Sequence, residues 1–442
     1  MKGRHFLYPA IFSLAALPMC LGFAGTDAFT GRWDRVERSA ARLVSAPAAA
    51  ADDDSALANY QQALKVLKDE YYPEPVSTSK SRELTYAAIR GMLQTLNDPF
   101  TGFLDQDEWS SMQQTTRGDF DGVGAELDEV GGAIVVKRPI PQTPAFYAGV
   151  KARDQLLAVG EFRGSTLVRE RSVRGKSIND VVRLIKGPKG TWVSLRVARR
   201  GSPKQLTFRI RREHIEPPVV QFWMEDEKNG IGHIVLNEFN EKSDEQLDHA
   251  LSILKSQGMK GLVFDLRYNP GGLLTVAISV ASRFVKEGPV VILQEKNGQR
   301  NDQDARSSQS RITVPTVVLV NESSASASEI VAGAIKDYGA AKIVGVHTFG
   351  KGLVQTLYPL EDGSALRLTT ARYFTAKGSD INNRYDELHR PIFGTGGIKP
   401  DIVVQQSKDW VDQDFDDKKN DTQLQKALEL LRGELLIAQR PH

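Results

Sequence analysis

Residues 316–336 read TVVLVNESSASASEIVAGAIK: an apolar run, a serine-rich turn and a helix-forming run in succession. The pattern predicts a buried strand at 316–320 and a helix at 327–336, and a strand followed by a helix is typical of α/β proteins. Ser326 lies in the connecting turn, beside helix N–H groups that have no intrahelical acceptor and can stabilise an oxyanion. Ser326 and Glu329 also suit a simple helix cap. This turn alone therefore leaves a nucleophile and a cap as alternatives.

The same alternation continues on both sides of this stretch, after Pro217-Pro218. Strands are predicted at 231–239, 262–266 and 342–346, and helices at 244–256 and 273–284. Alternating strands and amphipathic helices predict an α/β core.

The region before this core has a different pattern. Residues 118–213 combine short β-prone runs at 133–136, 193–197 and 206–210 with a helical stretch at 178–185. Outside this module, helices are predicted at 56–72, at 84–96 before Asp98-Pro99, and at 422–436. A chain of 442 residues is expected to form two or three domains.

Composition narrows the class of function. The chain has 57 Lys and Arg against 55 Asp and Glu, which gives a formal net charge of +2. This balance provides no basic field for nucleic acid. The sequence contains no clustered metal-ligand motif and no convincing cofactor loop, so we expect neither a metal nor a cofactor.

The N-terminus predicts export. Lys2 and Arg4 precede an apolar run at 6–24 that ends in small residues, which is typical of a secretory signal peptide. Cleavage is expected near residue 24, although the alanine tract before Asp52 is a second candidate. The single cysteine, Cys20, lies inside the signal, so no thiol chemistry is expected in the mature protein. We predict a periplasmic or cell-envelope protein, either soluble or membrane-associated.

A lysine flanked by glycines is the second candidate site. Lys351 stands between Gly350 and Gly352 at the end of an apolar stretch. A lysine acts as a general base only if burial lowers its pKa from about 10.4 to roughly 7 or 8, and glycines allow a tight backbone that buries it. Gln355 is placed to orient the amine. A solvated lysine in a turn is the simpler alternative.

A third segment, 265–272, reads DLRYNPGG and connects a strand to a helix. Its glycine amides can face a carbonyl oxygen. Taken alone, the segment favours a simple turn.

Together these three segments resemble the carboxyl-terminal processing, or tail-specific, protease family, whose pattern has Asn-Pro-Gly-Gly, a serine-rich turn and Phe-Gly-Lys-Gly in this order. The resemblance runs from about residue 98 to 401. The family's nucleophile stands 25 positions before its lysine, which selects Ser326 rather than Ser324 or Ser328. The resemblance implies Ser326 as nucleophile, Lys351 as base, Gln355 as its orienter, and Gly272 and Ala327 as oxyanion amides.

The resemblance also implies a multidomain α/β fold, in which a PDZ-like domain is inserted before a ClpP/crotonase-like protease core. Gly122, Val123, Gly124 and Ala125 resemble the loop that receives a peptide's terminal carboxylate. A plain glycine turn is the alternative there. The expected domains are a signal peptide (1–24), a linker (25–51), a helical segment (52–112), the PDZ-like domain (113–212), the protease core (213–408) and a helical tail (409–442).

The predicted function is an exported serine endopeptidase that recognises the free C-termini of protein or peptide substrates. Its expected partners are an adaptor or activator protein and further copies of itself. One alternative is a catalytically silent PDZ scaffold. A Ser-His-Asp hydrolase is another, although His347 and the remaining histidines form no recognisable triad motif. Residues 161–173 and 379–396 depart from the family pattern and are predicted to be surface loops.

Overall fold

The computed structural model describes residues 53–72, 76–306, 311–387, 390–392, 394–408, 410 and 418–438. The predicted signal peptide with Cys20, and the predicted linker, lie outside these residues. The chain divides into two compact units, residues 1–83 and 84–442. Helix α2 (Asp53–Glu70) belongs to the first unit. Within the described ranges, no helix is both long and apolar enough to cross a membrane.

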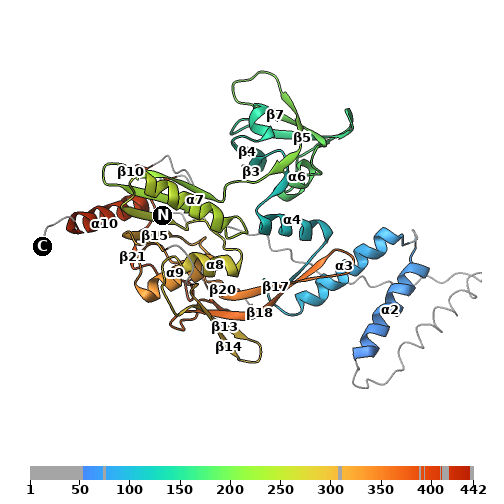
Figure 1. The fold of residues 1–442 in the computed structure, drawn as a ribbon. Coiled ribbons are helices and arrows are strands. Elements are labelled where there is room, and N and C mark those ends of the chain that lie inside the picture. The colour runs from blue at the N-terminus through green and yellow to red at the C-terminus, as the bar shows by residue number, and fades with distance from the viewer. Residues whose placement is uncertain are drawn as a thin grey trace, which may run out of the picture. The chain divides into compact units, whose positions relative to one another are not determined.

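The centre of the second unit is a six-stranded sheet (Figure 1). Its order is β10 (Val220–Asp226), β11 (Ile231–Leu236), β12 (Gly261–Asp265), β15 (Thr316–Val320), β16 (Lys342–Gly345) and β21 (Ile402–Val403). All neighbours from β11 to β21 are parallel, and β10 is an antiparallel edge. Every residue of β11, β12 and β15 is buried, as expected for parallel strands covered on both faces.

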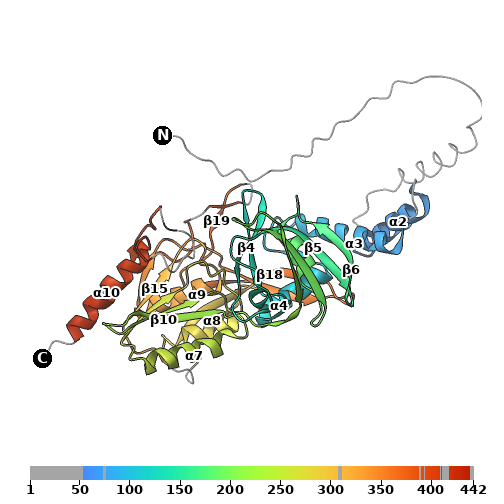
Figure 2. The ribbon, with the colours of Figure 1, turned by 90° about the horizontal axis from the view of Figure 1, so that it is seen from above.

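Helices cover both faces of this sheet. Helices α7 (Ser243–Ser256), α8 (Leu274–Ala281) and α9 (Ala327–Tyr338) share a core with Val318 and Val320. The alternate residues Val317 and Leu319 pack against α10 (Thr422–Ala438) on the other face. Figure 2 shows α10 and α7 on opposite sides of the sheet. The leucine face of the predicted C-terminal helix therefore covers the core.

A second sheet packs against α9. It has the order β1 (Gly102–Leu104), β18 (Ala365–Thr375), β13 (Pro289–Glu295) and β14 (Arg300–Asp304), and β17 (Leu353–Pro359) also pairs with β18. Sequence patterns did not predict this sheet, because most residues of β17 and β18 are only partly buried and lack a continuous apolar run. This sheet carries Gln355.

The inserted module has its own sheet and core. Its sheet runs β3 (Ala125–Val130), β4 (Ala133–Pro139), β5 (Gln155–Arg163), β7 (Trp192–Ala198) and β8 (Leu206–Arg211), with β6 (Thr166–Ser172) on β5. Helices α5 (Pro144–Tyr147) and α6 (Ile178–Ile185) complete it. The chain enters through β2 (Phe120–Gly122) and leaves through β9 (Glu213–Ile215), and these two strands pair. The predicted multidomain α/β fold with an inserted PDZ-like domain is confirmed.

Three details differ from the sequence predictions. Residues 161–173, predicted as a surface loop, are the end of β5 and the exposed strand β6, which pair as a hairpin. The second N-terminal helix, α3, spans Thr78–Gln94, so it begins earlier than predicted and ends before Asp98-Pro99. The prediction of a surface loop at 379–396 is wrong for its first part, since Ile381 and Asn383 are buried. Asn383 is buried because it hydrogen-bonds with the carbonyl oxygens of Phe349 and Gly350. The short strands β19 (Arg384–Tyr385) and β20 (Pro391–Ile392) follow.

Candidate active site

Ser326 stands at the start of α9 in a backbone conformation that L-residues rarely adopt. Its φ is 55° and its ψ is −113°. Asn269 fixes this turn, because its carbonyl oxygen accepts from the Ala325 amide at 3.0 Å and from the Ser328 hydroxyl at 2.9 Å. Strained non-glycine residues that surrounding contacts hold in place are found at functional sites.

Burial separates the three serines of the turn. Ser324 and Ser328 are fully buried, and both hydroxyls donate to backbone carbonyl oxygens. Ser326 is only partly buried. Of the three, Ser326 has the hydroxyl that a substrate can reach.

A buried carboxylate joins the serine turn to the lysine loop. Oε2 of Glu329 accepts from the amides of Ser326 at 2.8 Å and Lys351 at 2.9 Å. Its Oε1 accepts from the Gly350 amide at 2.7 Å and the Thr348 hydroxyl at 2.6 Å. Burial raises the pKa of Glu329 and these four donors oppose that rise. The sequence pattern predicts only a capping role for Glu329, because spacing does not reveal a contact with residues 348–351.

Lys351 lies in a partly buried environment. Burial and then the positive charge of Arg367 lower the pKa of Lys351, whereas Glu329 and Asp98 oppose this shift. Its Nζ stands 4.9 Å from the centroid of the Phe100 ring. Among the described side chains, no hydrogen bond joins Nζ to the Ser326 hydroxyl. The backbones of the two residues are thus held together, while their side chains are not in hydrogen-bond contact.

Close packing explains the glycines around Lys351. A Cβ atom on Gly350, where φ is +88°, would lie 2.4 Å from Nδ2 of Asn383. A Cβ atom on Gly352 would lie 2.5 Å from the backbone nitrogen of Asn382. The loop therefore accepts only glycine on both sides of Lys351.

The Asn-Pro-Gly-Gly turn lies directly against Ser326. A Cβ atom on Gly271 would come within 2.7 Å of Ser326 Cβ and 2.9 Å of the Ala327 nitrogen. The Gly271 amide donates to Oδ1 of Asn269. In the part of the chain that the structure describes, the amides of Gly272 and Ala327 have no hydrogen-bond acceptor. Two unpaired amides next to a serine are a suitable arrangement for an oxyanion hole.

Gln355 makes a different contact from the predicted one. Its Nε2 donates to the Thr369 hydroxyl at 2.7 Å, and that hydroxyl donates to Asp98. Its Oε1 is buried without a hydrogen-bond partner. No hydrogen bond between Gln355 and Lys351 is found in the described ranges, so the orienting role stays a prediction.

A buried charge cluster supports the strand end below the turn. Arg267 pairs with Asp265 at 2.7 Å and with Asp421, just before α10, at 2.8 Å. His233 contacts Asp265 and Glu225 from the neighbouring strands. No local sequence signal predicts this cluster, because Glu225 and Asp421 lie 196 positions apart. It connects α10 to strand β12, which leads into the Asn-Pro-Gly-Gly turn.

The predicted carboxylate loop borders a pocket in the inserted module. This pocket, of about 70 Å³, lies between Gly122–Ala125 and α6. The amides of Val123 and Gly124 have no acceptor among the described residues. The Thr143 hydroxyl donates to the Gly124 carbonyl oxygen at 2.9 Å and holds the loop. Free backbone amides at the end of a groove are the donors that capture a peptide's terminal carboxylate.

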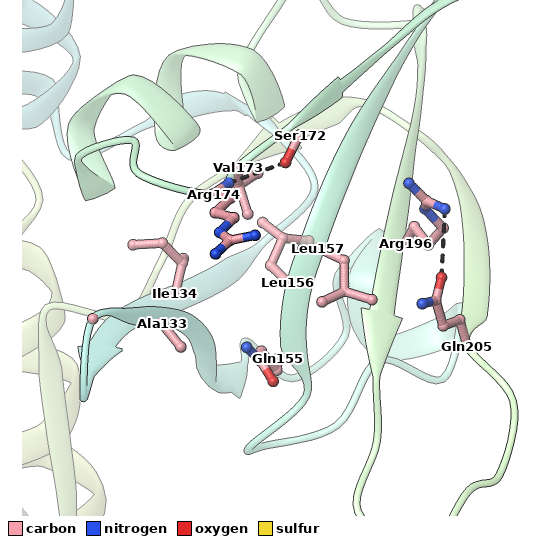
Figure 3. Close-up of a pocket in the computed structure, with 11 residues that line it drawn as sticks. Ala133, Ile134, Gln155, Leu156, Leu157, Ser172, Val173, Arg174, Arg196 and Gln205 are labelled. Atoms are coloured by element: carbon pink, nitrogen blue, oxygen red, sulfur yellow. Dashed lines mark hydrogen bonds between the residues drawn. The ribbon is translucent and has the colours of Figure 1, made fainter.

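A larger pocket in the same module, of about 450 Å³, lies elsewhere (Figure 3). Its lining includes Leu156, Arg174 and Arg196, and Arg196 donates to Gln205. It contains none of the predicted site residues.

Two family descriptions match the chain. The one described as Peptidase family S41 matches residues 230–404, which hold Ser326, Lys351 and the glycine turn. The one described as Activating protease CtpB N-terminal domain matches residues 19–108. Fold and family together define a serine-type peptidase.

Similar proteins show to which group of serine-type peptidases the chain belongs. The chain is 35% identical over 357 residues to the carboxy-terminal processing protease CtpA of Bacillus subtilis strain 168, covering 80% of this chain and 70% of that protein. It is 34% identical over 379 residues to the carboxyl-terminal-processing protease of Synechocystis sp., covering 85% and 82%. The chain therefore belongs to the carboxyl-terminal processing proteases of peptidase family S41. Among solved structures, a photosystem II D1 C-terminal processing protease matches with a TM-score of 0.46 and 32% identity, covering 78% of this chain and 86% of that one.

Proposed function

We propose that the chain is an exported endopeptidase that cleaves peptide bonds with Ser326 as nucleophile and Lys351 as general base. The observation that carries this proposal is the shared carboxylate of Glu329, which binds the amides of both residues at 2.8 and 2.9 Å. Such a link fixes the distance between the two backbones. Serine peptidases need this fixed geometry because nucleophile and base act as one unit.

In the proposed reaction, the Ser326 hydroxyl attacks the scissile carbonyl carbon and neutral Lys351 takes its proton. The amides of Gly272 and Ala327 stabilise the negative oxygen of the tetrahedral intermediate. The Lys351 ammonium then protonates the leaving amine, which departs and leaves an acyl-enzyme. Water, deprotonated by Lys351, releases the acyl group and restores Ser326.

Lys351 must turn its Nζ toward Ser326 for the first proton transfer. Catalytic hydrogen bonds are often absent before substrate binds and form in the complex. The unpaired Oε1 of Gln355 supports an orienting role, since it is a buried acceptor available to an amine. The partly buried position of Lys351 supports a neutral amine near neutral pH.

The inserted module is proposed to bind the C-terminus of the substrate. Unpaired amides at Val123 and Gly124 support this role, and the remaining peptide would add as a strand beside β3. Export rests on the sequence of residues 1–24 alone. An adaptor or activator and self-association are proposed as further partners.

The proposed nucleophile and base can be tested with an active-site probe and matched variants. A fluorophosphonate should label the wild type and the Ser323→Ala control, in which an exposed serine of the same turn is removed. Ser326→Ala and Lys351→Ala should each abolish labelling and hydrolysis, and the double variant should be no slower than either single one. Near-normal turnover by Lys351→Ala would reject the base. A catalytically silent scaffold would leave even the wild type unlabelled.

The contacts of the histidines do not support a histidine as the general base for Ser326. Nδ1 of His347 lies 3.5 Å from the Thr348 carbonyl oxygen, and no histidine in the described ranges hydrogen-bonds to Ser326. An inactive His347→Ala variant beside an active Lys351→Ala variant would restore that alternative.

A further inference from the structure

A pocket of about 430 Å³ lies beside the oxyanion turn, in the second unit. Glu238, Tyr268 and Pro270, which belong to the α/β core region outside the inserted module, form one side of it. Ala125, Glu126 and Arg138 of the inserted module form part of the other. The pocket thus borders both the turn next to Ser326 and the strand that follows the carboxylate loop. Its volume is within the range of pockets that hold small ligands or side chains.

Glu238 differs from the other charged residues of this pocket. Glu126 and Arg138 pair with each other at 2.8 Å, and Arg267 pairs with Asp265 and Asp421. Among the described residues, the Glu238 side chain has neither a hydrogen bond nor an ion pair. Burial raises the pKa of Glu238 to about 7. A half-buried carboxyl group without a partner is unfavourable for stability, which points to a role in binding.

Glu238 also stands next to the reaction centre. The following residue, Phe239, donates its amide to the Gly271 carbonyl oxygen at 2.9 Å and accepts from the Leu273 amide at 2.7 Å. Phe239 is thus paired with the Asn-Pro-Gly-Gly turn at residues 269–272, and Glu238 directly precedes Phe239 in the chain.

We propose that Glu238 is a specificity-determining residue that binds a lysine or arginine side chain on the C-terminal side of the scissile bond. This inference rests on the proposed function. A substrate held at Ser326 and at the carboxylate loop places the segment after the scissile bond between these two sites, where the pocket lies. A cation there gives the Glu238 carboxylate a charge-assisted hydrogen bond, which an apolar or acidic side chain cannot form.

Peptide hydrolysis tests the proposal. A series of peptides shares one cleavage site and one C-terminal tail, and carries a single lysine at successive positions after the scissile bond. Norleucine, which is similar in shape and uncharged, replaces lysine in the matched peptides. For the wild type we expect kcat/KM to be about tenfold higher with lysine at one position.

Three variants link this preference to Glu238. In Glu238→Gln the lysine-to-norleucine ratio should fall to about one, because the amide has the same shape and no charge. In Glu238→Lys the preference should change to a glutamate peptide. The control Glu241→Gln, which removes an exposed carboxylate three residues further on, should keep the wild-type ratio. A wild-type ratio near one at every position, or an unchanged ratio in Glu238→Gln, would overturn the proposal.

A binding measurement separates this proposal from the proposed function. Fluorescence anisotropy with Ser326→Ala reports peptide affinity without cleavage. The affinity of Ser326→Ala should favour the lysine peptide, and Ser326→Ala/Glu238→Gln should lose that preference. If Ser326→Ala still hydrolysed peptides, the nucleophile assignment would fail, whereas the lysine-to-norleucine ratio would still decide the role of Glu238.

Discussion

At the scale of single residues, Glu329 organises the site without touching substrate. Its two carboxylate oxygens accept four hydrogen bonds from the serine turn and the lysine loop. In a glutamine at this position an NH₂ group would replace one of the two oxygens, so two of the four donors would face another donor in either orientation of the amide. The positive φ of Ser326 depends on the same contacts, and such a conformation costs on the order of 1–3 kcal/mol.

We therefore expect Glu329→Gln to lose both stability and activity. At least two donors lose a charged acceptor, so the free energy of unfolding should fall by about 1–3 kcal/mol. Urea unfolding measures this change, and probe labelling of Ser326 measures the site. Glu322→Gln, at an exposed position in the same turn, is the control and should resemble the wild type. Wild-type stability in Glu329→Gln would show that the buried carboxylate is dispensable.

The pH dependence of kcat tests the state of Lys351. If Lys351 is the base, it must be neutral to act, so kcat should rise with pH through one ionisation whose pKa is lowered, and activity should fail in acid. Arg367→Gln removes a charge that lowers this pKa, so the profile should move to higher pH. Asp98→Asn removes a charge that raises it, so the profile should move to lower pH, each by up to about one unit. A flat profile from about pH 5 to 9, with chemistry rate-limiting, would contradict a lysine base.

At the scale of elements, the glycine turn and the start of α9 form one packed unit. Gly271 and Gly131 both have positive φ, but only a Cβ atom on Gly271 would meet Ser326 and Ala327, since Gly131 faces open space.

In Gly131→Ala the free energy of unfolding should fall by about 1 kcal/mol, and the activity should stay at the wild-type level. Gly271→Ala should lose more stability than Gly131→Ala, because the backbone of the serine turn must also shift, and it should lose about 100-fold in kcat, because the proposed oxyanion amides are displaced. Equal kcat values for the two variants would contradict this packing.

These elements also show what a sequence can and cannot predict. The all-buried strand at 316–320 and its helix were predicted almost to the residue, because a continuous apolar run and a helical period are local signals. Strand β18 was not predicted, since its exposed and buried residues follow neither period cleanly. The hydrogen bond between Asp98 and Thr369 joins residues 271 positions apart, and no local spacing encodes such a contact. Motif resemblance selected Ser326 and Lys351, but the carboxylate between them became visible only in the fold.

At the scale of the whole molecule, we expect the PDZ-like domain to regulate catalysis and not merely to tether substrates. A bound C-terminus can shift the enzyme tenfold toward an active state if it binds that state better by about 1.4 kcal/mol. Amidating the C-terminus of a model substrate should then lower kcat at saturating concentration. Simple tethering would instead raise KM and leave kcat unchanged.

A variant of the module provides a second readout. Replacing Gly124 of the carboxylate loop with valine would not test regulation alone, because it would also disturb the fold. A Cβ atom at Gly124, where φ is +77°, would lie 2.3 Å from Thr143 Cβ. Val182→Asp, in the pocket beside the loop, should repel a terminal carboxylate and lower kcat. Val168→Asp, on the exposed strand β6, is the matched control. Unchanged kcat in Val182→Asp at saturating substrate would reject regulation by the loop.

We expect the protein to self-associate through α2 and not through α10. The leucine face of α10 is occupied by the sheet, so Leu431→Asp should unfold the protein instead of dissociating an oligomer. Leu57, Val66 and Leu67 of α2 are exposed and are the better candidates for contacts between copies. Light scattering at micromolar concentration should show an oligomer that loses mass when residues 53–72 are removed. Only monomer before and after this deletion would remove the idea.

The pairing of β2 with β9 has a consequence for the evolution of such enzymes. Phe120 and Ile215 are partners across this ladder, so about 95 residues leave and re-enter the protease at nearly the same point. An insertion with adjacent ends can be exchanged without altering the chain order of the host. The proposed recognition module can thus be exchanged as one piece, and a chimera carrying another peptide-recognition domain on this stem should bind new clients, while its kcat will report whether the new domain also supplies the regulatory contact.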